Sequence, residues 1–524
     1  MDEMKIREHF SSSSRLDFLF PFLRTLSFRV TRFWFELTYF IILSLLGFLA
    51  LNVSSFRTLP SFRPKNLDLF FTSVSSITVS SMATVEMEVF SDIQLVFITI
   101  LMFLGGEVFI SFLGLQLMKY FNDIDNKESI LVQNKVDFDS SNYSIHQLEL
   151  GMVTIDHHLR DHENFDVKLG PTFKLKCIRF LGYVVLGYIL VVVFLGYSLV
   201  SMYMSFSPSA PHILNEKGLN FRTFSLFTTV STFANCGFAP TNENMIIFKK
   251  NSGFLLILIP QILLGNTLYP PFLRLTIWFL WKITKREEFN HILKDSKRLG
   301  YSQLFPSYET ISLVITVLGF IFVQFIVFCS LEWYSEATYG LSAKEKLVGS
   351  LFEVVNSRHA GESVFDLSTL SPAILLVFIL MMYLSPYGCF LPVDSCQGSW
   401  KITKRINRRK GSNLVEIIMF SQLSYVVIFT ILICITERDK MKNDPLNFSV
   451  LNIVFEVVSA YGNVGLSMGY SCARQVKPNG HCKDAMYGFA GRWSGTGKFI
   501  LIVVMFMGKL KKYNKRGGKA WKLL

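Results

Sequence analysis

Charged residues are scarce in this sequence. They make up only 17% of its 524 residues, whereas apolar residues make up 51% and aromatic residues 15%. A soluble protein of this length has no core large enough to hide so much apolar surface. This composition excludes a soluble protein and predicts a chain that crosses a membrane several times.

Several kinds of functional motif are also missing. The eight cysteines form no C-x-x-C pair, which excludes zinc and thioredoxin-like sites. The run "GTGK" at 495–498 lacks the spacing of a nucleotide-binding P-loop. No nucleophile or acid–base constellation lies within the apolar stretches, and the basic residues form no single patch for nucleic acid. We therefore expect neither an enzyme nor a nucleic-acid-binding protein, and no cofactor.

Eight apolar stretches approach or exceed the roughly 20 residues that span a bilayer core. They cover 33–53, 95–117, 178–206, 253–281, 308–333, 372–392, 412–436 and 498–510. The first lacks a signal-peptide cleavage pattern, so it is expected to remain as an anchor. Lysine and arginine are concentrated in every second connecting segment, which predicts that both termini are cytoplasmic.

A repeat lies between the spans of each predicted pair. Phe-x-x-Val followed by Ser or Asn occurs at 71–75, 227–231, 352–356 and 455–459, each time after an odd-numbered span and before an even-numbered one. A small residue follows the Phe by ten positions in three copies and by nine in the third: Ser81, Gly237, Gly361 and Gly465. One interpretation is four similar interfacial helices.

The alternative interpretation is a re-entrant loop, in which a half-helix enters the membrane and returns as extended backbone. Such backbone is tolerated only when it is buried in protein or lines a water-filled cavity, and four loops around one axis satisfy both conditions. A ring of backbone carbonyls replaces the hydration shell of a cation, and glycine permits the turn that this requires. The repeat therefore predicts a central pathway for ions.

The loop sequences carry a resemblance to a known family. They read "TVSSM" (78–82), "ANCGF" (234–238), "RHAGE" (358–362) and "NVGLS" (463–467), and "MFLGGEVF" (102–109), "GNTLYPPFLR" (265–274) and "GRWSGTGKF" (491–499) accompany them. Together these motifs, spread over almost the whole chain, resemble the Trk/Ktr/HKT superfamily of cation transporters and in particular the plant HKT family.

The resemblance implies an all-α polytopic fold of eight transmembrane helices. These form four membrane–pore–membrane repeats, like those of potassium channels, around a pseudo-fourfold pore. The implied filter residues are Ser81, Gly237, Gly361 and Gly465, flanked by Val79, Ser80, Asn235, Cys236, His359, Ala360, Asn463 and Val464. The resemblance also implies a homodimer in the plasma membrane, surrounded by lipid, with a role in salt tolerance.

The expected organisation alternates repeats with polar segments. The four repeats are placed at 33–117, 178–281, 308–392 and 412–510. The cytoplasmic tails are placed at 1–32 and 511–524, and the cytoplasmic linkers at 118–177, 282–307 and 393–411.

Ser81 departs from the glycine found in the other three loops. Its Cβ and hydroxyl disfavour the even cage that suits K⁺, and in the plant family a serine here marks the sodium-selective subfamily. The sequence thus predicts passive Na⁺ transport, with Na⁺ bound at the filter. Alternatives are a neutral Ser81, a register in which Ser80 takes its place, Na⁺/K⁺ symport, K⁺ permeation and, remotely, a membrane-embedded enzyme.

Ionisable residues near the predicted pore are further candidates. Lys498 and Arg492 lie at the start of the last span, either beside the pathway as in related transporters or snorkelling to the interface. Glu86, Glu243 and Glu362 follow the loops, as an acidic vestibule that concentrates cations or as ordinary solvated or helix-capping carboxylates.

Three structural features complete the predictions. Glu353 and Glu456 lie inside the short segments, where burial requires a partner, either Arg358 or nearby backbone donors. Cys472 and Cys482 share an outer segment in which a disulfide is possible. Finally, "LSPYGCFLP" (384–392) breaks the sixth span, either as an intramembrane gate or as a simple proline kink.

Overall fold

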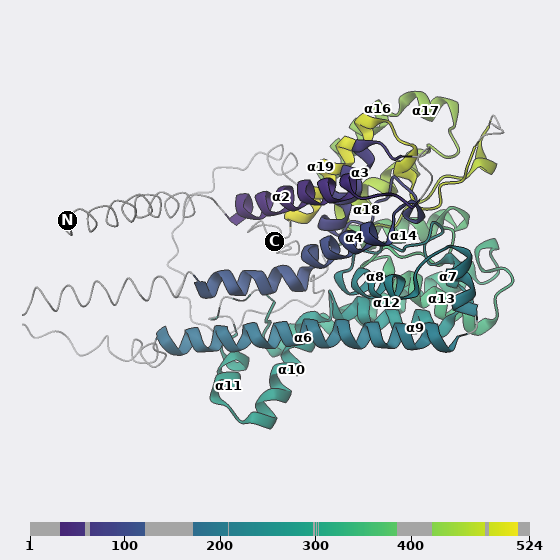
Figure 1. Ribbon diagram of the computed structural model, residues 1–524. Coiled ribbons are helices and arrows are strands. Elements are labelled where there is room, and N and C mark those ends of the chain that lie inside the picture. The colour runs from purple at the N-terminus through teal and green to yellow at the C-terminus, as the bar shows by residue number, and fades with distance from the viewer. Residues whose placement is uncertain are drawn as a thin grey trace, which may run out of the picture.

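The computed structural model describes most of the chain as helices (Figure 1). The described residues are 32–57, 63–120, 171–207, 209–296, 299, 301, 303–384, 422–476 and 482–511. Within these ranges the only β-pairing is the isolated bridge between Tyr470 and Ala485. The mostly helical architecture agrees with the fold class expected from the sequence.

The described helices repeat one unit four times: a first span, a short helix and a second span. The units are α2 (Arg32–Val53), α3 (Asn66–Thr78) and α4 (Asp92–Gly105); α6 (Pro171–Phe206), α8 (Phe221–Ala234) and α9 (Ser252–Leu264); α12 (Ser307–Glu332), α13 (Ala343–Asn356) and α14 (Pro372–Tyr383); and α16 (Gln422–Thr436), α18 (Val450–Gly462) and α19 (Gly495–Lys511). The Phe-x-x-Val repeat lies in α3, α8, α13 and α18, the short helices.

The units pack as a closed ring. Each short helix lies against the first span of its own unit, and also against the second span of the preceding unit. Thus α4 packs on α8, α9 on α13, α14 on α18, and α19 on α3, which closes the cycle. In Figure 1 the helices α2, α3, α16 and α19 lie above α6, α8, α9 and α12. This arrangement brings the four short helices around one centre.

Short helices of this kind begin at polar caps. Ser342 and Glu345 form a capping box at the start of α13, Ser449 accepts a bond from the Asn452 amide in α18, and Asn220 accepts one from the Arg222 amide in α8. Each cap satisfies a backbone donor that the first helical turn leaves unpaired. The capped ends fix where each chain segment turns inward toward the centre.

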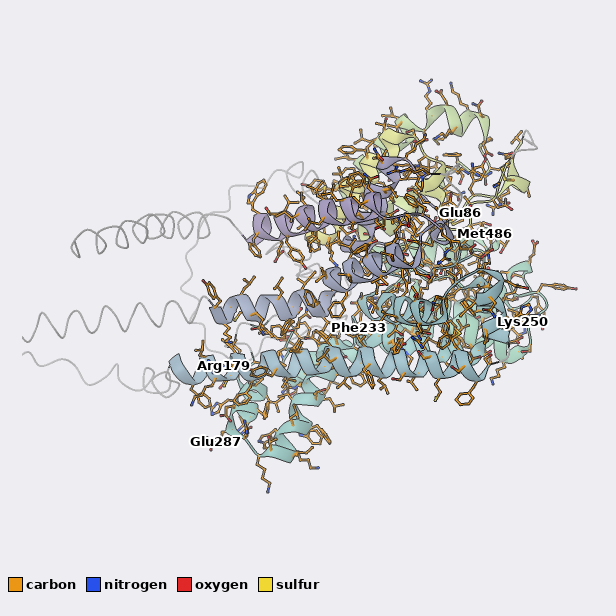
Figure 2. All side chains as sticks on the ribbon, viewed as in Figure 1. Glu86, Arg179, Phe233, Lys250, Glu287 and Met486 are labelled. Carbon is orange, nitrogen blue, oxygen red and sulfur yellow. A yellow bond between two sulfur atoms is a disulfide. The ribbon has the colours of Figure 1, made fainter. Side chains whose placement is uncertain are left out.

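The outer surface suits lipid. Three described helices are long and apolar enough to cross a membrane, at 34–53, 175–206 and 307–332, and the number rises to five when two bent pairs are counted. Apolar residues such as Leu49, Phe194 and Phe322 are exposed on these helices. Figure 2 shows Glu86 and Lys250 at one end of the structure and Arg179 and Glu287 at the other. The described helices therefore fit a polytopic membrane protein, although this count falls short of the eight expected.

Two second spans are bent where a single helix was expected. The helix 92–105 meets the helix 107–120 at 58°, and α9 meets α10 (Tyr269–Thr284) at 81°. A Cβ at Gly105 would lie 2.0 Å from the Ile77 carbonyl oxygen, and one at Gly265 would lie 1.8 Å from that of Phe233. The spans bend where glycine lets them touch the end of a short helix, and the two prolines that open α10 favour a new helix start.

Other helices lie outside the ring. They are α7 (Ser209–Glu216), α11 (Glu287–Lys294) and α17 (Arg438–Asn443). Most of the predicted tails and linkers, at 1–31, 121–170, 385–421 and 512–524, lie outside the described residues. The predicted gate residues Ser385, Pro386 and Gly388 fall in the third of these ranges.

Candidate ion pathway

Three of the four short helices end in a left-handed residue. Val79, Asn235 and Asn463 are the C-terminal caps of α3, α8 and α18, with φ of 57°, 56° and 52°. The helix α13 ends instead in a right-handed cap at Ser357. Because the C-terminus of a helix carries partial negative charge, four ends directed at one centre favour a cation there.

The four residues expected to form the filter share one unusual backbone conformation. Ser81, Gly237, Gly361 and Gly465 have φ of 51°, 87°, 70° and 100°. All four line one small cavity of about 50 Å³. Glycine adopts this conformation freely, whereas a serine there is strained. The position of Ser81 thus has the geometry of a glycine site.

Consecutive loops touch at these residues. A Cβ on Gly237 would lie 1.4 Å from the Ala360 carbonyl oxygen, and one on Gly361 would lie 2.2 Å from that of Val464. A Cβ on Gly465 would lie 2.2 Å from the Cβ of Ser81. The Cys236 thiol in turn interacts with the backbone of Ser81. The loops therefore form a continuous ring in chain order.

In three of the four loops, the Ser or Asn that ends the repeat motif holds the following turn. The Gly237 amide donates to Ser231 Oγ (3.1 Å), and the Gly465 amide donates to Ser459 Oγ (3.0 Å). In the third loop the Glu362 amide donates to Asn356 Oδ1 (3.3 Å). In the first loop Ser75 Oγ makes no bond with any described residue, so the loop with Ser81 lacks this side-chain support.

Flanking residues link the loops to their neighbours. Asn463 Nδ2 donates to Ser80 Oγ (2.7 Å), which joins the fourth loop to the first. His359 Nε2 lies 2.9 Å from the Thr267 hydroxyl, which joins the third loop to the second unit. Ser80 is not among the residues that line the cavity, and its hydroxyl is already bonded. This favours Ser81 over Ser80 as the residue that faces the cavity.

Gly508, Lys509 and Lys511, which the sequence analysis did not single out, support the ring from the last helix. Gly508 approaches the Tyr461 carbonyl as Gly105 and Gly265 approach theirs, since a Cβ on it would lie 2.3 Å away. Lys509 donates to the Gly105 carbonyl (2.8 Å) and Lys511 to that of Tyr461 (2.7 Å). The only signal in the sequence was a glycine in each second span of three units.

Buried glutamates form hydrogen bonds with the segments that follow the third and fourth turns. Glu353 accepts a bond from the Val364 amide (2.8 Å), and Glu456 accepts bonds from the Ser467 hydroxyl (2.9 Å) and the Ala490 amide (3.2 Å). Of the two kinds of partner expected, backbone donors hold Glu353, and Arg358 instead lies over the Phe320 ring. These carboxylates are structural supports, as expected.

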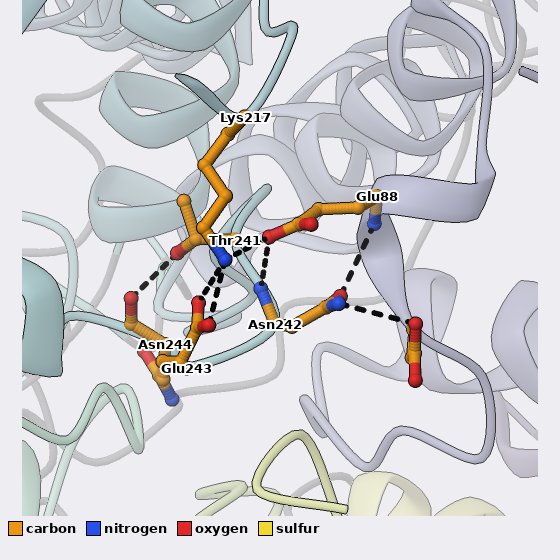
Figure 3. A network of polar contacts seen from close by, with 7 residues as sticks. Glu88, Lys217, Thr241, Asn242, Glu243 and Asn244 are labelled. Carbon is orange, nitrogen blue, oxygen red and sulfur yellow. Dashed lines mark hydrogen bonds and ion pairs between the residues drawn. The ribbon is translucent and has the colours of Figure 1, made fainter. Parts of the chain in front are cut away.

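The acidic residues expected in a vestibule divide into two groups. Lys217 lies between Glu243 (2.6 Å) and Glu88 (3.0 Å), as Figure 3 shows, and Asn242 donates to Glu86 (3.1 Å). None of these glutamates lines the cavity, and Glu362, in contrast to the others, is fully buried. The vestibule prediction is therefore wrong for Glu362, because burial keeps its carboxyl group out of contact with solvent.

Lys217 neutralises part of the acidic cluster formed by Glu86, Glu88 and Glu243. Burial lowers the pKa of Lys217, but hydrogen bonds to Glu243 and Glu88 outweigh burial and raise the pKa above its ordinary value. We expect Lys217→Met to expose the two carboxylates and to increase inward Na⁺ current about twofold at low ionic strength, because charged clefts concentrate cations. The increase should vanish at high ionic strength.

Voltage-clamp currents at fixed Na⁺ and varied ionic strength test this expectation. The control is Lys250→Met, which removes an exposed lysine that pairs with neither carboxylate and lies at the same end of the structure as Glu86 (Figure 2). Equal effects of the two variants would contradict a specific role for Lys217.

The two basic residues expected beside the pore lie elsewhere. Lys498 forms a buried ion pair with Asp68 of α3 at 2.6 Å, and Arg492 lies over the Tyr470 ring. Neither residue lines the cavity. In the segment between α18 and α19, Cys472 and Cys482 are joined by a disulfide with a Cα–Cα distance of 5.9 Å.

Known proteins resemble this chain over nearly its full length. It is 50% identical over 479 residues to the sodium transporter HKT1 of Arabidopsis thaliana, covering 90% of this chain and 91% of that protein. It is 48% identical to the cation transporter HKT1;3 of Oryza sativa subsp. japonica, covering 93% and 91%. The crystal structure of the potassium transporter TrkH from Vibrio parahaemolyticus shares the fold, with a TM-score of 0.50, 13% identity and coverage of 92% and 84%.

A family profile gives the same answer as the individual relatives. Residues 159–513 match the profile described as TrkH, cation transport protein. This range includes three of the four loops, and the first loop closes the ring with them. The chain belongs to the TrkH family of cation transport proteins.

Proposed function

We propose that this protein conducts Na⁺ passively and selectively across the plasma membrane through the ring of four loops. The observation that carries the proposal is the ring itself: four left-handed turns line one cavity, and the C-terminal ends of four short helices point to it. One relative that is 50% identical to this chain is named a sodium transporter. The driving force is the Na⁺ gradient with the membrane potential, about 2.3 kcal/mol per charge per 100 mV.

The ring binds a cation without trapping it. Backbone carbonyls replace water around the ion, while the negative ends of the helices lower the cost of dehydration. The four turn residues themselves, Ser81, Gly237, Gly361 and Gly465, carry no acidic or basic side chain, although Asp366 also lines the cavity. A cation at the turns is therefore coordinated only by groups with partial charges, which permits rapid release.

Ser81 favours Na⁺ over K⁺ in this account. Its Cβ occupies the space in which the other three turns carry only hydrogen, and its φ of 51° holds the serine in a glycine conformation. The added atoms narrow one side of the cavity and supply a hydroxyl oxygen. A narrower and less even ring suits the smaller ion.

Ser81→Gly tests this assignment. We expect the K⁺ permeability relative to Na⁺ to rise about tenfold or more, equivalent to 1.4 kcal/mol, because the turn of the first loop then matches the other three. The measurement is the shift in reversal potential when external Na⁺ is exchanged for K⁺. Ala83→Gly, at a neighbouring position that also lines the cavity, is the control. An unchanged permeability ratio in Ser81→Gly would overturn the role of Ser81.

The proposal extends to topology and assembly. Both termini are placed in the cytoplasm because of the distribution of lysine and arginine. A homodimer, in which each chain keeps its own pathway, is proposed from the resemblance to the family. Cysteine accessibility on intact cells tests the first statement, and cross-linking in native membranes tests the second.

A further inference from the structure

The third loop places a carboxyl group behind the cavity wall. Gly361 and Ser363 line the cavity, but Glu362 between them does not, and it is fully buried. The residues that follow the turn in the other loops are apolar and buried: Met82, Phe238 and Leu466. Only the third loop of the ring carries a charge-bearing side chain at this position.

This carboxyl group has no partner within the described residues. Both of its oxygens are buried without a hydrogen bond. Glu353 and Glu456, the buried glutamates within the short helices α13 and α18, accept bonds from backbone and hydroxyl donors. The nearby basic residue Arg358 lies over the ring of Phe320 at 4.7 Å. The usual ways of compensating a buried carboxylate are therefore missing at Glu362.

Glu362 lies near the boundary between the second and third loops. Its carboxyl group acts electrostatically on the buried Cys236 of the second loop, as does Lys509, and neither of its oxygens bonds to a described residue. An isolated buried charge is costly unless an opposite charge compensates it. In a low-dielectric surrounding, a cation held by the turns beside Glu362 is attracted over several ångströms.

We propose that Glu362 is the counter-charge of the transported cation: its carboxylate, behind the wall of the third loop, strengthens the binding of a monovalent cation in the ring. This inference rests on the proposed function and deepens it by naming a residue that sets affinity. Glu362 acts through space on the ion and does not coordinate it. If the carboxyl group of Glu362 is instead protonated and neutral, its replacement by an amide leaves the affinity for the cation unchanged.

The test compares Glu362→Gln, which removes the charge but keeps the shape, with Glu362→Asp, which keeps the charge. We expect the Na⁺ concentration for half-maximal current to rise about tenfold in the Gln variant, as for a charge interaction of moderate strength. The Asp variant should stay close to the unmodified protein. Glu336→Gln, an exposed carboxylate of the same unit, is the control and should have no effect.

If the Gln variant reaches the cell surface poorly and gives too little current, a second measurement replaces the current recording. In purified protein, Na⁺ should raise the melting temperature relative to a large organic cation, because a ligand of the native state stabilises it. The Gln variant should lose most of this rise. An unchanged half-saturation, or an unchanged Na⁺-dependent rise, would overturn the counter-charge role. Absence of Na⁺ current in the unmodified protein would instead overturn the proposed function, and this inference with it.

Discussion

Gly237→Ala is expected to abolish transport. The added Cβ would lie 1.4 Å from the carbonyl oxygen of Ala360, and that oxygen belongs to the neighbouring loop of the ring. The φ of 87° adds a strain that an alanine does not relieve. Backbone cannot move aside as the end of a flexible side chain can, so the ring must distort. We expect at least a hundredfold loss of current, about 2.7 kcal/mol or more.

The structure provides a control that separates strain from crowding. Gly340 has a similar φ of 74°, but a Cβ there would meet nothing within 4 Å. Gly340→Ala should therefore retain most of the current. Currents are normalised to the amount of protein at the cell surface, measured with an external tag. Normal current in Gly237→Ala would show that the loops do not meet as described.

Breaking the Asp68–Lys498 ion pair is expected to lower the stability of the folded protein strongly. The two side chains are about 10% exposed and their charged atoms lie 2.6 Å apart, although 430 residues separate them in the chain. Removing one partner of a buried pair costs about 3–5 kcal/mol. Because a whole domain is stable by only about 5–15 kcal/mol, Lys498→Met and Asp68→Asn should each lower the melting temperature sharply.

A double variant distinguishes a structural role from a role in the pathway. Asp68→Leu combined with Lys498→Met removes both charges and should recover most of the melting temperature, measured in detergent by the loss of monodisperse protein on heating. Its reversal potential should equal that of the unmodified protein, because neither residue lines the cavity. A changed Na⁺/K⁺ selectivity in the double variant would instead support the earlier expectation that Lys498 lies beside the ion.

The repeat motif predicted the positions of the four short helices and their turns, because residues within each motif determine them. Phe-x-x-Val-Ser/Asn places a hydrogen-bonding side chain one turn before the end of α3, α8 and α18, and at the last residue of α13. Ser231 and Ser459 use that position to hold the following turn. The small residue that follows was recognisable because left-handed backbone restricts residue choice. The one-residue shortening of the third copy was also visible in the spacing.

Contacts between distant segments were not predictable in the same way. The partner of Lys498 is Asp68, and nothing local in the sequence joins them. The bends in two second spans follow from contact with the ends of short helices. Such contacts cannot be predicted from the apolar composition of the spans. Glu362 was expected in the vestibule because it follows a loop, but it is buried between Gly361 and Ser363, which line the cavity.

The reversal potential of the unmodified protein tests the central claim most directly. Currents are recorded from cells that express the full chain while external Na⁺ is replaced stepwise by K⁺ at constant ionic strength. A Na⁺-selective ring predicts a reversal potential that follows the Na⁺ gradient and a loss of inward current in K⁺ alone. A reversal potential that follows K⁺ as closely as Na⁺, or current that requires both ions together, would contradict passive and selective Na⁺ transport.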